Sequence, residues 1–127
     1  MAITIMVVDD SKLARIVAGK AIDQLQPEWV RVEAANADEA VALVNGGDVD
    51  VALLDYNMPG KNGLELASEL RGLRPFMPIA VITANTQDEV IAQARAINAA
   101  FVGKPVTAEA LRGFLDGAAL RLRGDKK

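Results

Sequence analysis

The chain contains neither cysteine nor histidine among its 127 residues. Without cysteine, disulfide bonds, thiolate catalysis and zinc–thiolate sites are excluded. Without histidine, the chain lacks the commonest general base and the commonest metal ligand, and it cannot itself carry a phosphohistidine. Any metal ion must therefore bind to oxygen atoms, which favours hard cations such as Mg²⁺.

Long apolar runs are also missing. No run approaches the roughly 18–20 residues that cross a bilayer. The segment 1–8 is too short, and too soon followed by Asp9 and Asp10, for a signal peptide. We therefore expect a cytoplasmic protein without a membrane partner. The net charge is −3 and basic residues are scattered except in the tail, so we expect no nucleic-acid partner.

What the chain does contain is five short apolar segments that alternate with amphipathic ones. The expected strands are Ile3–Val8, Trp29–Ala35, Val49–Leu54, Pro78–Thr83 and Ala100–Gly103. The first, third and fourth lack polar alternation, which is typical of parallel strands covered on both faces. With 51% hydrophobic residues, the length suits a single domain over residues 1–127.

The intervening segments have helical periodicity. In the first, Leu13, Ile16, Val17 and Ala21 share one face. Ser11 and Thr107 are expected N-caps. The whole pattern predicts an α/β fold: a (βα)5 doubly wound, five-stranded parallel sheet between two helical layers.

In such folds, chemistry is found at the carboxyl ends of the strands. The first strand ends in Asp9-Asp10, the third ends in Asp55, the fourth ends in Thr83, and the fifth leads into Lys104. Alone, each residue is more typical of a turn, a cap or an ordinary strand end. Their joint placement at one sheet edge favours a functional site.

These side chains have complementary chemistry. Three carboxylates held together repel one another, so we expect a raised pKa for at least one, and a divalent cation would remove the repulsion. Lys104 and Thr83 can then bind a second anion through an ammonium and a hydroxyl. A metal, an ammonium and a hydroxyl around an acidic nucleophile suit phosphoryl transfer.

These motifs resemble those of the receiver domain of two-component response regulators, of the single-domain CheY-like type, with its flavodoxin-like fold. The resemblance covers essentially the whole chain. The matching segments are Val7–Ser11, Leu54–Gly60 with Gly63, Ile82–Ala84 and Lys104-Pro105.

The resemblance implies that Asp55 accepts a phosphoryl group from a phosphohistidine on a sensor histidine kinase or a histidine phosphotransfer protein. It implies that Asp10, Asp55 and the backbone carbonyl of Asn57 bind Mg²⁺, and that Asp9 holds a metal-bound water. Thr83 and Lys104 would contact phosphoryl oxygens, with the lysine aimed by a cis peptide bond before Pro105.

A switch is implied as well. Thr83 would move toward the phosphoryl group, Phe101 would turn inward, and the surface of the fourth helix, fifth strand and fifth helix would change its protein contacts. The ring of Phe101 lacks the hydroxyl of the tyrosine found in many family members, and a simple core aromatic is the alternative interpretation. Asn57 and Asn85 would flank the hydrolytic water and tune the phosphoryl lifetime.

Lys12 and Arg15 follow the acidic pair and are near enough in sequence to approach the site, but a solvated first helical turn is the favoured interpretation. A haloacid-dehalogenase-like hydrolase is disfavoured, because that class needs a second acid where Asn57 stands. A flavodoxin-like cofactor carrier is disfavoured, because Asp9 and Asp10 would repel a phosphate. We expect no enzymatic activity beyond self-catalysed phosphoryl uptake and autodephosphorylation.

The output stays open at this level. Only residues 124–127 follow the last helix, so a full-length protein of this size would signal by protein contact. The alternatives are an adaptor, a phosphate sink in a relay, or a fragment of a longer regulator. We expect a monomer, with phosphorylation-dependent dimerisation as the alternative; the downstream target is unknown.

Overall fold

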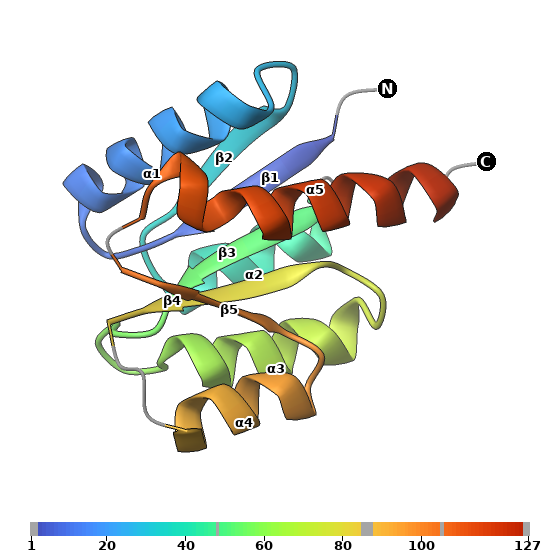
Figure 1. Ribbon diagram of the computed structural model, residues 1–127. Helices are drawn as coiled ribbons and strands as arrows, with labels where there is room; N and C mark the ends of the chain where they lie inside the picture. Colours follow the sequence, from blue (N-terminus) through green and yellow to red (C-terminus); the bar gives the residue numbers. More distant parts are fainter. Residues whose placement is uncertain (1–2, 48, 85–87, 105, 126–127) are drawn as a thin grey trace.

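Ten elements alternate regularly along the chain in the computed structural model, which describes residues 3–47, 49–84, 88–104 and 106–125 (Figure 1). They are β1 Thr4–Val8, α1 Lys12–Leu25, β2 Val30–Ala34, α2 Ala37–Asn45, β3 Val51–Asp55, α3 Gly63–Leu73, β4 Ile79–Thr83, α4 Asp88–Ala96, β5 Ala100–Gly103 and α5 Ala108–Asp125. All pairings in the single sheet are parallel, in the order β2-β1-β3-β4-β5. The predicted (βα)5 doubly wound fold is confirmed.

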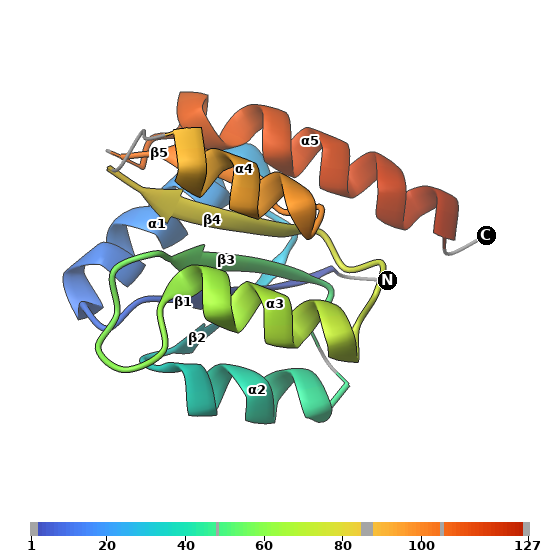
Figure 2. The ribbon, with the colours of Figure 1, turned by 90° about the horizontal axis from the view of Figure 1, so that it is seen from below.

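Two helical layers cover the sheet, as Figures 1 and 2 show. Helices α1 and α5 pack on one face through a core that includes Ile22, Leu111 and Leu115. Helices α2, α3 and α4 pack on the other face through a second core that includes Leu66 and Leu70. Because both faces are covered, every residue of β3 and β4 is buried, as the lack of polar alternation predicted.

The limits of β5 match the prediction, and those of the other four strands differ by one or two residues. Asp55 is the last residue of β3, as expected for the end of the third strand. Asp55 pairs with Ile82 in the register, and Tyr56 N–H still donates to the Ile82 carbonyl at 2.8 Å. The Asp55 backbone is therefore fixed by the sheet itself.

The apolar face of α1 that begins at Leu13 is not the face that packs in the core. Leu13 is 70% exposed, and Ile16 and Val17 are also exposed. The buried stripe is instead Ala18, Ala21, Ile22 and, in part, Leu25. The stripe that begins at Leu13 meets Lys20 and Gln24 at helical spacing, so it cannot continue as a core face.

Both predicted N-caps are confirmed. The hydroxyl of Ser11 accepts from Ala14 N–H at 3.2 Å, and that of Thr107 accepts from Ala110 N–H at 3.0 Å. Among the helices of the described residues, none is long and apolar enough to cross a membrane. The expected location in the cell stays a prediction.

Candidate functional site

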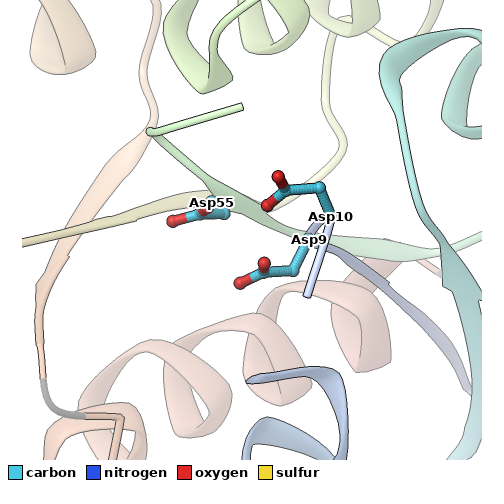
Figure 3. Close-up of side chains that lie close together, drawn as sticks. All are labelled: Asp9, Asp10 and Asp55. Carbon is cyan, nitrogen blue, oxygen red and sulfur yellow. The ribbon is translucent and has the colours of Figure 1, made fainter. Parts of the chain in front are cut away.

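Three carboxylates meet where β1 and β3 end (Figure 3). Asp9 and Asp10 follow β1, and Asp55 is the last residue of β3. One oxygen of each lies within 4.8 Å of the others. The strand order reverses direction at β1 and β3, which is where ligands bind in doubly wound folds. The predicted acidic cluster is confirmed as a geometric group.

Burial concentrates polar atoms at this one place. Over the described residues, the buried polar or charged side chains are Asp9, Asp55 and Thr83. Burying a polar side chain costs free energy that an apolar side chain at the same position would not cost. Their burial indicates a function.

Asp55 Oδ1 is the most informative atom of the cluster. Lys104 Nζ lies 3.0 Å away, close enough for an ion pair. The same oxygen nevertheless has no hydrogen-bond partner within the described part of the chain. The two observations agree once direction is considered: the ammonium is near, but not aligned as a hydrogen-bond donor. Three converging carboxylates with such an oxygen fit a hard divalent cation.

Asp9 is held by several groups around it. Its backbone N–H donates to the Ala34 carbonyl at 3.1 Å, and its Oδ1 accepts from Ser11 N–H at 2.9 Å. Burial raises the pKa of Asp9, repulsion from Asp55 and Asp10 adds to the rise, and the Ser11 N–H and Lys104 oppose it. The expected raised pKa is confirmed at Asp9, with burial as its largest cause.

Thr83 and Lys104 come from the next two strands. Thr83 is the last residue of β4 and its side chain is fully buried. Lys104 directly follows β5, and its backbone N–H donates to the Thr83 carbonyl at 3.1 Å. The two residues are thus fixed to one another through the backbone, and Lys104 reaches Asp55 from there.

The loop from β3 to α3 surrounds Asp55 from the other side. Buried Met58 anchors the loop in the core, while Asn57 is exposed. Gly60 adopts a φ of 79°, which favours glycine. Gly63 N–H donates to the Tyr56 carbonyl at 3.0 Å, which closes the loop onto the end of β3.

Phe101 is half-buried on β5 and packs against the core of the α2, α3 and α4 layer. Asn85 and Pro105, predicted to tune the lifetime and to aim the lysine, lie outside the described residues. Lys12 is exposed, as predicted.

Arg15 is not solvated, contrary to the prediction. Its side chain is only 15% exposed and donates to the Asp9 carbonyl at 2.6 Å. No pattern of side chains indicates this contact, because the acceptor is a backbone carbonyl of the preceding loop.

A family model described as the response regulator receiver domain matches residues 5–116. The chain belongs to this family. It is 37% identical over 117 residues to the cyclic di-GMP phosphodiesterase response regulator RpfG of Xanthomonas campestris pv. campestris, covering 88% of this chain and 30% of that protein. It is also 37% identical over 108 residues to the transcriptional regulatory protein CitT of Bacillus subtilis, covering 84% and 47%. The chain therefore spans less than half the length of these two curated relatives.

Solved structures agree with this assignment. The chemotaxis protein CheY4 of Vibrio cholerae superposes with a TM-score of 0.83 at 26% identity, covering 93% of this chain and 99% of that one. The REC domain of AraT, a response regulator from Geobacillus stearothermophilus, superposes with a TM-score of 0.86 at 26% identity, and each chain is covered completely. Members of the family generally accept a phosphoryl group, bind Mg²⁺ through acidic residues and are not enzymes in themselves.

Proposed function

We propose that Asp55 is the phosphoacceptor of this receiver, and that its donor is a phosphohistidine on a sensor histidine kinase or a histidine phosphotransfer protein. The observation that carries this assignment is Asp55 Oδ1, buried beside Lys104 and the acidic pair without a hydrogen-bond donor among the described residues. An oxygen in this environment is ready to contact a cation or an electrophile. Receiver domains take their phosphoryl groups from such kinases or phosphotransfer proteins.

The chemical step is a displacement at phosphorus. A carboxylate oxygen of Asp55 forms a bond to phosphorus while the phosphorus–nitrogen bond of the donor histidine breaks, and the released imidazole takes a proton from solvent. Lys104 would hold one phosphoryl oxygen with its ammonium, and Thr83 another with its hydroxyl. The placement of Lys104 beside Asp55, and its backbone bond to Thr83, supports these roles.

Asp10, Asp55 and the Asn57 carbonyl would hold Mg²⁺, with Asp9 acting through a metal-bound water. When bound, the ion offsets the negative charge of the carboxylates and of the phosphoryl group. The carboxylate cluster supports Asp10 and Asp55 in this role, and the exposed position of Asn57 in the adjoining loop leaves it accessible. Asn57 and Asn85 would border the approach of the hydrolytic water.

The switch would transmit phosphorylation to a protein partner. Thr83 and Phe101 lie on neighbouring strands, and Phe101 pairs with Val81, two residues before Thr83. A shift of Thr83 toward the phosphoryl group would let the Phe101 ring turn inward and reshape the α4–β5–α5 surface. A groove of about 270 Å³ lies between α5 and the starts of β4 and β5, bordered by Asn98, Phe114 and Arg121, and supports the β5–α5 part of this surface as a contact region.

The output is a separate question, on which the relatives differ. One is a phosphodiesterase response regulator and another a transcriptional regulatory protein, so the family does not specify a single output. We propose that residues 1–127 act as one receiver domain, monomeric before phosphorylation, whose own chemistry is limited to phosphoryl uptake and autodephosphorylation. An adaptor, a phosphate sink in a relay and a fragment of a longer regulator are the alternatives.

The test is phosphorylation with acetyl phosphate and Mg²⁺, followed by intact-mass measurement. We expect one base-labile phosphoryl group on the wild type and none on Asp55→Asn. Asp50→Asn is the matched control, because Asp50 precedes the opposite end of the same strand and should keep full labelling. Full labelling of Asp55→Asn would overturn the assignment of the acceptor.

A further inference from the structure

Arg15 links three parts of the fold at the edge of the acidic cluster. It lies on the first turn of α1, and its terminal nitrogen donates to the backbone carbonyl of Asp9 at 2.6 Å, at the end of β1. Its Nε donates to Glu33 Oε1 on β2 at 2.7 Å. The two bonds use different nitrogens of one planar guanidinium, so they fix its orientation as well as its position.

The carbonyl that Arg15 contacts belongs to the peptide that joins Asp9 to Asp10. Two other hydrogen bonds hold Asp9: its N–H donates to the Ala34 carbonyl, and its carboxylate accepts from the Ser11 N–H. The bond from Arg15 to the Asp9 carbonyl is a third. Rotation of this peptide would turn both neighbouring carboxylates. Because two acidic side chains depend on one peptide plane, a donor on its carbonyl controls how both face Asp55.

Charge is a weaker explanation for Arg15 than geometry. Its guanidinium is paired with Glu33, which offsets much of its positive charge before it can act on the cluster. Its contact to Asp9 is to the carbonyl, not to the carboxylate. Arg15 is therefore built to orient the acidic loop instead of neutralising it.

We propose that Arg15, oriented by Glu33, is a positioning residue that sets the Asp9–Asp10 peptide for binding of Mg²⁺. This inference rests on the proposed function of the site. Groups that orient metal ligands without touching the metal typically change affinity by about 10- to 100-fold when they are removed. The loss should thus appear in Mg²⁺ affinity of the unphosphorylated protein, not only in phosphorylation.

The chain offers a matched control in Arg31. It also joins β2 to α1, donating to Asp23 Oδ1 at 2.8 Å and to Asp23 Oδ2 at 3.0 Å. This pair lies at the other end of the two elements, and neither residue belongs to the acidic cluster. Arg31→Met removes the same kind of interelement ion pair without touching Asp9.

The experiment measures the Kd for Mg²⁺ by isothermal titration calorimetry, together with the thermal midpoint of each metal-free protein. We expect Arg15→Met to raise the Kd by about 10- to 100-fold and Arg31→Met to leave it unchanged. Arg15→Lys keeps the charge but not the two fixed donors, so it should also weaken binding. Glu33→Gln keeps an oxygen acceptor for Arg15 and should stay near the wild-type Kd.

Equal Kd values for Arg15→Met and Arg31→Met would overturn the inference, as would a wild-type Kd for Arg15→Lys. Should Arg15→Met fail to fold, the Arg15→Lys result decides. The proposed function is checked separately on the wild type: absence of both Mg²⁺ binding and labelling by acetyl phosphate would overturn it, and this inference with it. Normal wild-type behaviour with unaffected Arg15 variants would overturn the inference alone.

Discussion

Gly63 shows how closely the backbone approaches Asp55, the proposed phosphoacceptor. It is the first residue of α3, after the Asn62 cap, and its N–H is bonded to the Tyr56 carbonyl. A Cβ at this position would lie 2.5 Å from the carbonyl oxygen of Asp55 and 2.9 Å from the Tyr56 Cα. Both neighbours are backbone atoms of the β3 end, which cannot move aside as a flexible side chain can. Only glycine lets the helix begin this close to Asp55.

We therefore predict that Gly63→Ala lowers the free energy of unfolding by about 1–3 kcal/mol, as overpacking usually does. The same displacement of the Asp55 backbone should slow labelling by acetyl phosphate. Urea denaturation measures the first effect. Gly113→Ala is the control, because a Cβ there has no neighbour within 4 Å. In the interior of α5 it should instead stabilise by about 0.5–1 kcal/mol. Equal stability of both variants would contradict this account of Gly63.

Single residues of the site were predictable to different degrees. Asp9, Asp10 and Asp55 could be brought together from sequence, because the carboxyl ends of parallel strands share one edge of a sheet. The contact between Arg15 and the Asp9 carbonyl was not predictable, because no side-chain pattern marks a backbone acceptor. The approach of Gly63 to Asp55 depends on the path of the β3–α3 loop, which the residue pattern alone does not determine.

At the scale of elements, Arg71 joins two turns at the edge of the sheet opposite the site. From α3 it donates to carbonyls of the α3–β4 turn, with the shortest bond, 2.7 Å, to Met77. It also donates to the Ile97 and Asn98 carbonyls after α4, at 2.9 and 3.0 Å. Burial lowers the pKa of Arg71, and the positive charge of Arg121 lowers it further. Carbonyls at helix ends need such donors, and here the Arg71 side chain donates to carbonyls that follow both α3 and α4.

Replacing Arg71 by Met should cost about 1–2 kcal/mol of unfolding free energy, because several partly buried carbonyls would lose a donor. The effect should be local as well: amide exchange at Asn98 and Ala99, in the turn between α4 and β5, should become faster. Hydrogen-exchange mass spectrometry measures this. The exposed Arg112→Met on α5 provides the comparison and should change neither quantity. Unchanged exchange in Arg71→Met would show that the turn holds without this contact.

The positions of the helices and strands could be predicted better than the helix faces that pack in the core. The strand positions followed from apolar runs, because a parallel strand buried on both sides leaves a clear pattern. The buried face of α1 could not be read from its periodicity, because two apolar stripes compete on this helix and small residues such as Ala18 and Ala21 mark the buried one. Periodicity shows that a helix is amphipathic, and a large apolar residue such as Leu13 is a stronger signal in it than alanine. Close packing against the sheet nevertheless favours the smaller side chains.

For the whole molecule, the acidic cluster lowers the free energy of unfolding, and the apolar cores offset this loss. Two well-packed cores cover both faces of the sheet, and the buried polar side chains of the described residues are gathered at the ends of β1, β3 and β4. Ionised Asp9 loses hydration on burial and is repelled by Asp55 and Asp10. The metal-free protein should therefore be less stable than its cores allow, and bound Mg²⁺ should recover part of the loss.

The loss of stability caused by the buried Asp9 carboxyl should depend on pH. The ordinary pKa of the Asp9 carboxyl is 3.8, and burial raises it in the folded protein. Between these two values the folded state holds more protons than the unfolded state, so the free energy of unfolding falls as pH rises and levels off above the raised pKa. In EDTA, Asp9→Asn should lack this fall and be more stable than the wild type at about pH 7. Urea denaturation from about pH 4 to about pH 7 measures the difference.

Mg²⁺ should act in the opposite direction, because it binds the ionised carboxylates of the folded state. At a Mg²⁺ concentration about 100 times the wild-type Kd, the ion would stabilise the wild type by about 2.7 kcal/mol at neutral pH. The same concentration would stabilise Asp9→Asn by less. Asp116→Asn removes the same charge from an exposed position on α5 and should keep the wild-type dependence on both pH and Mg²⁺. If Asp9→Asn and Asp116→Asn behaved alike, the loss of stability would come from the net charge of the protein and not from the buried carboxylates at one sheet edge.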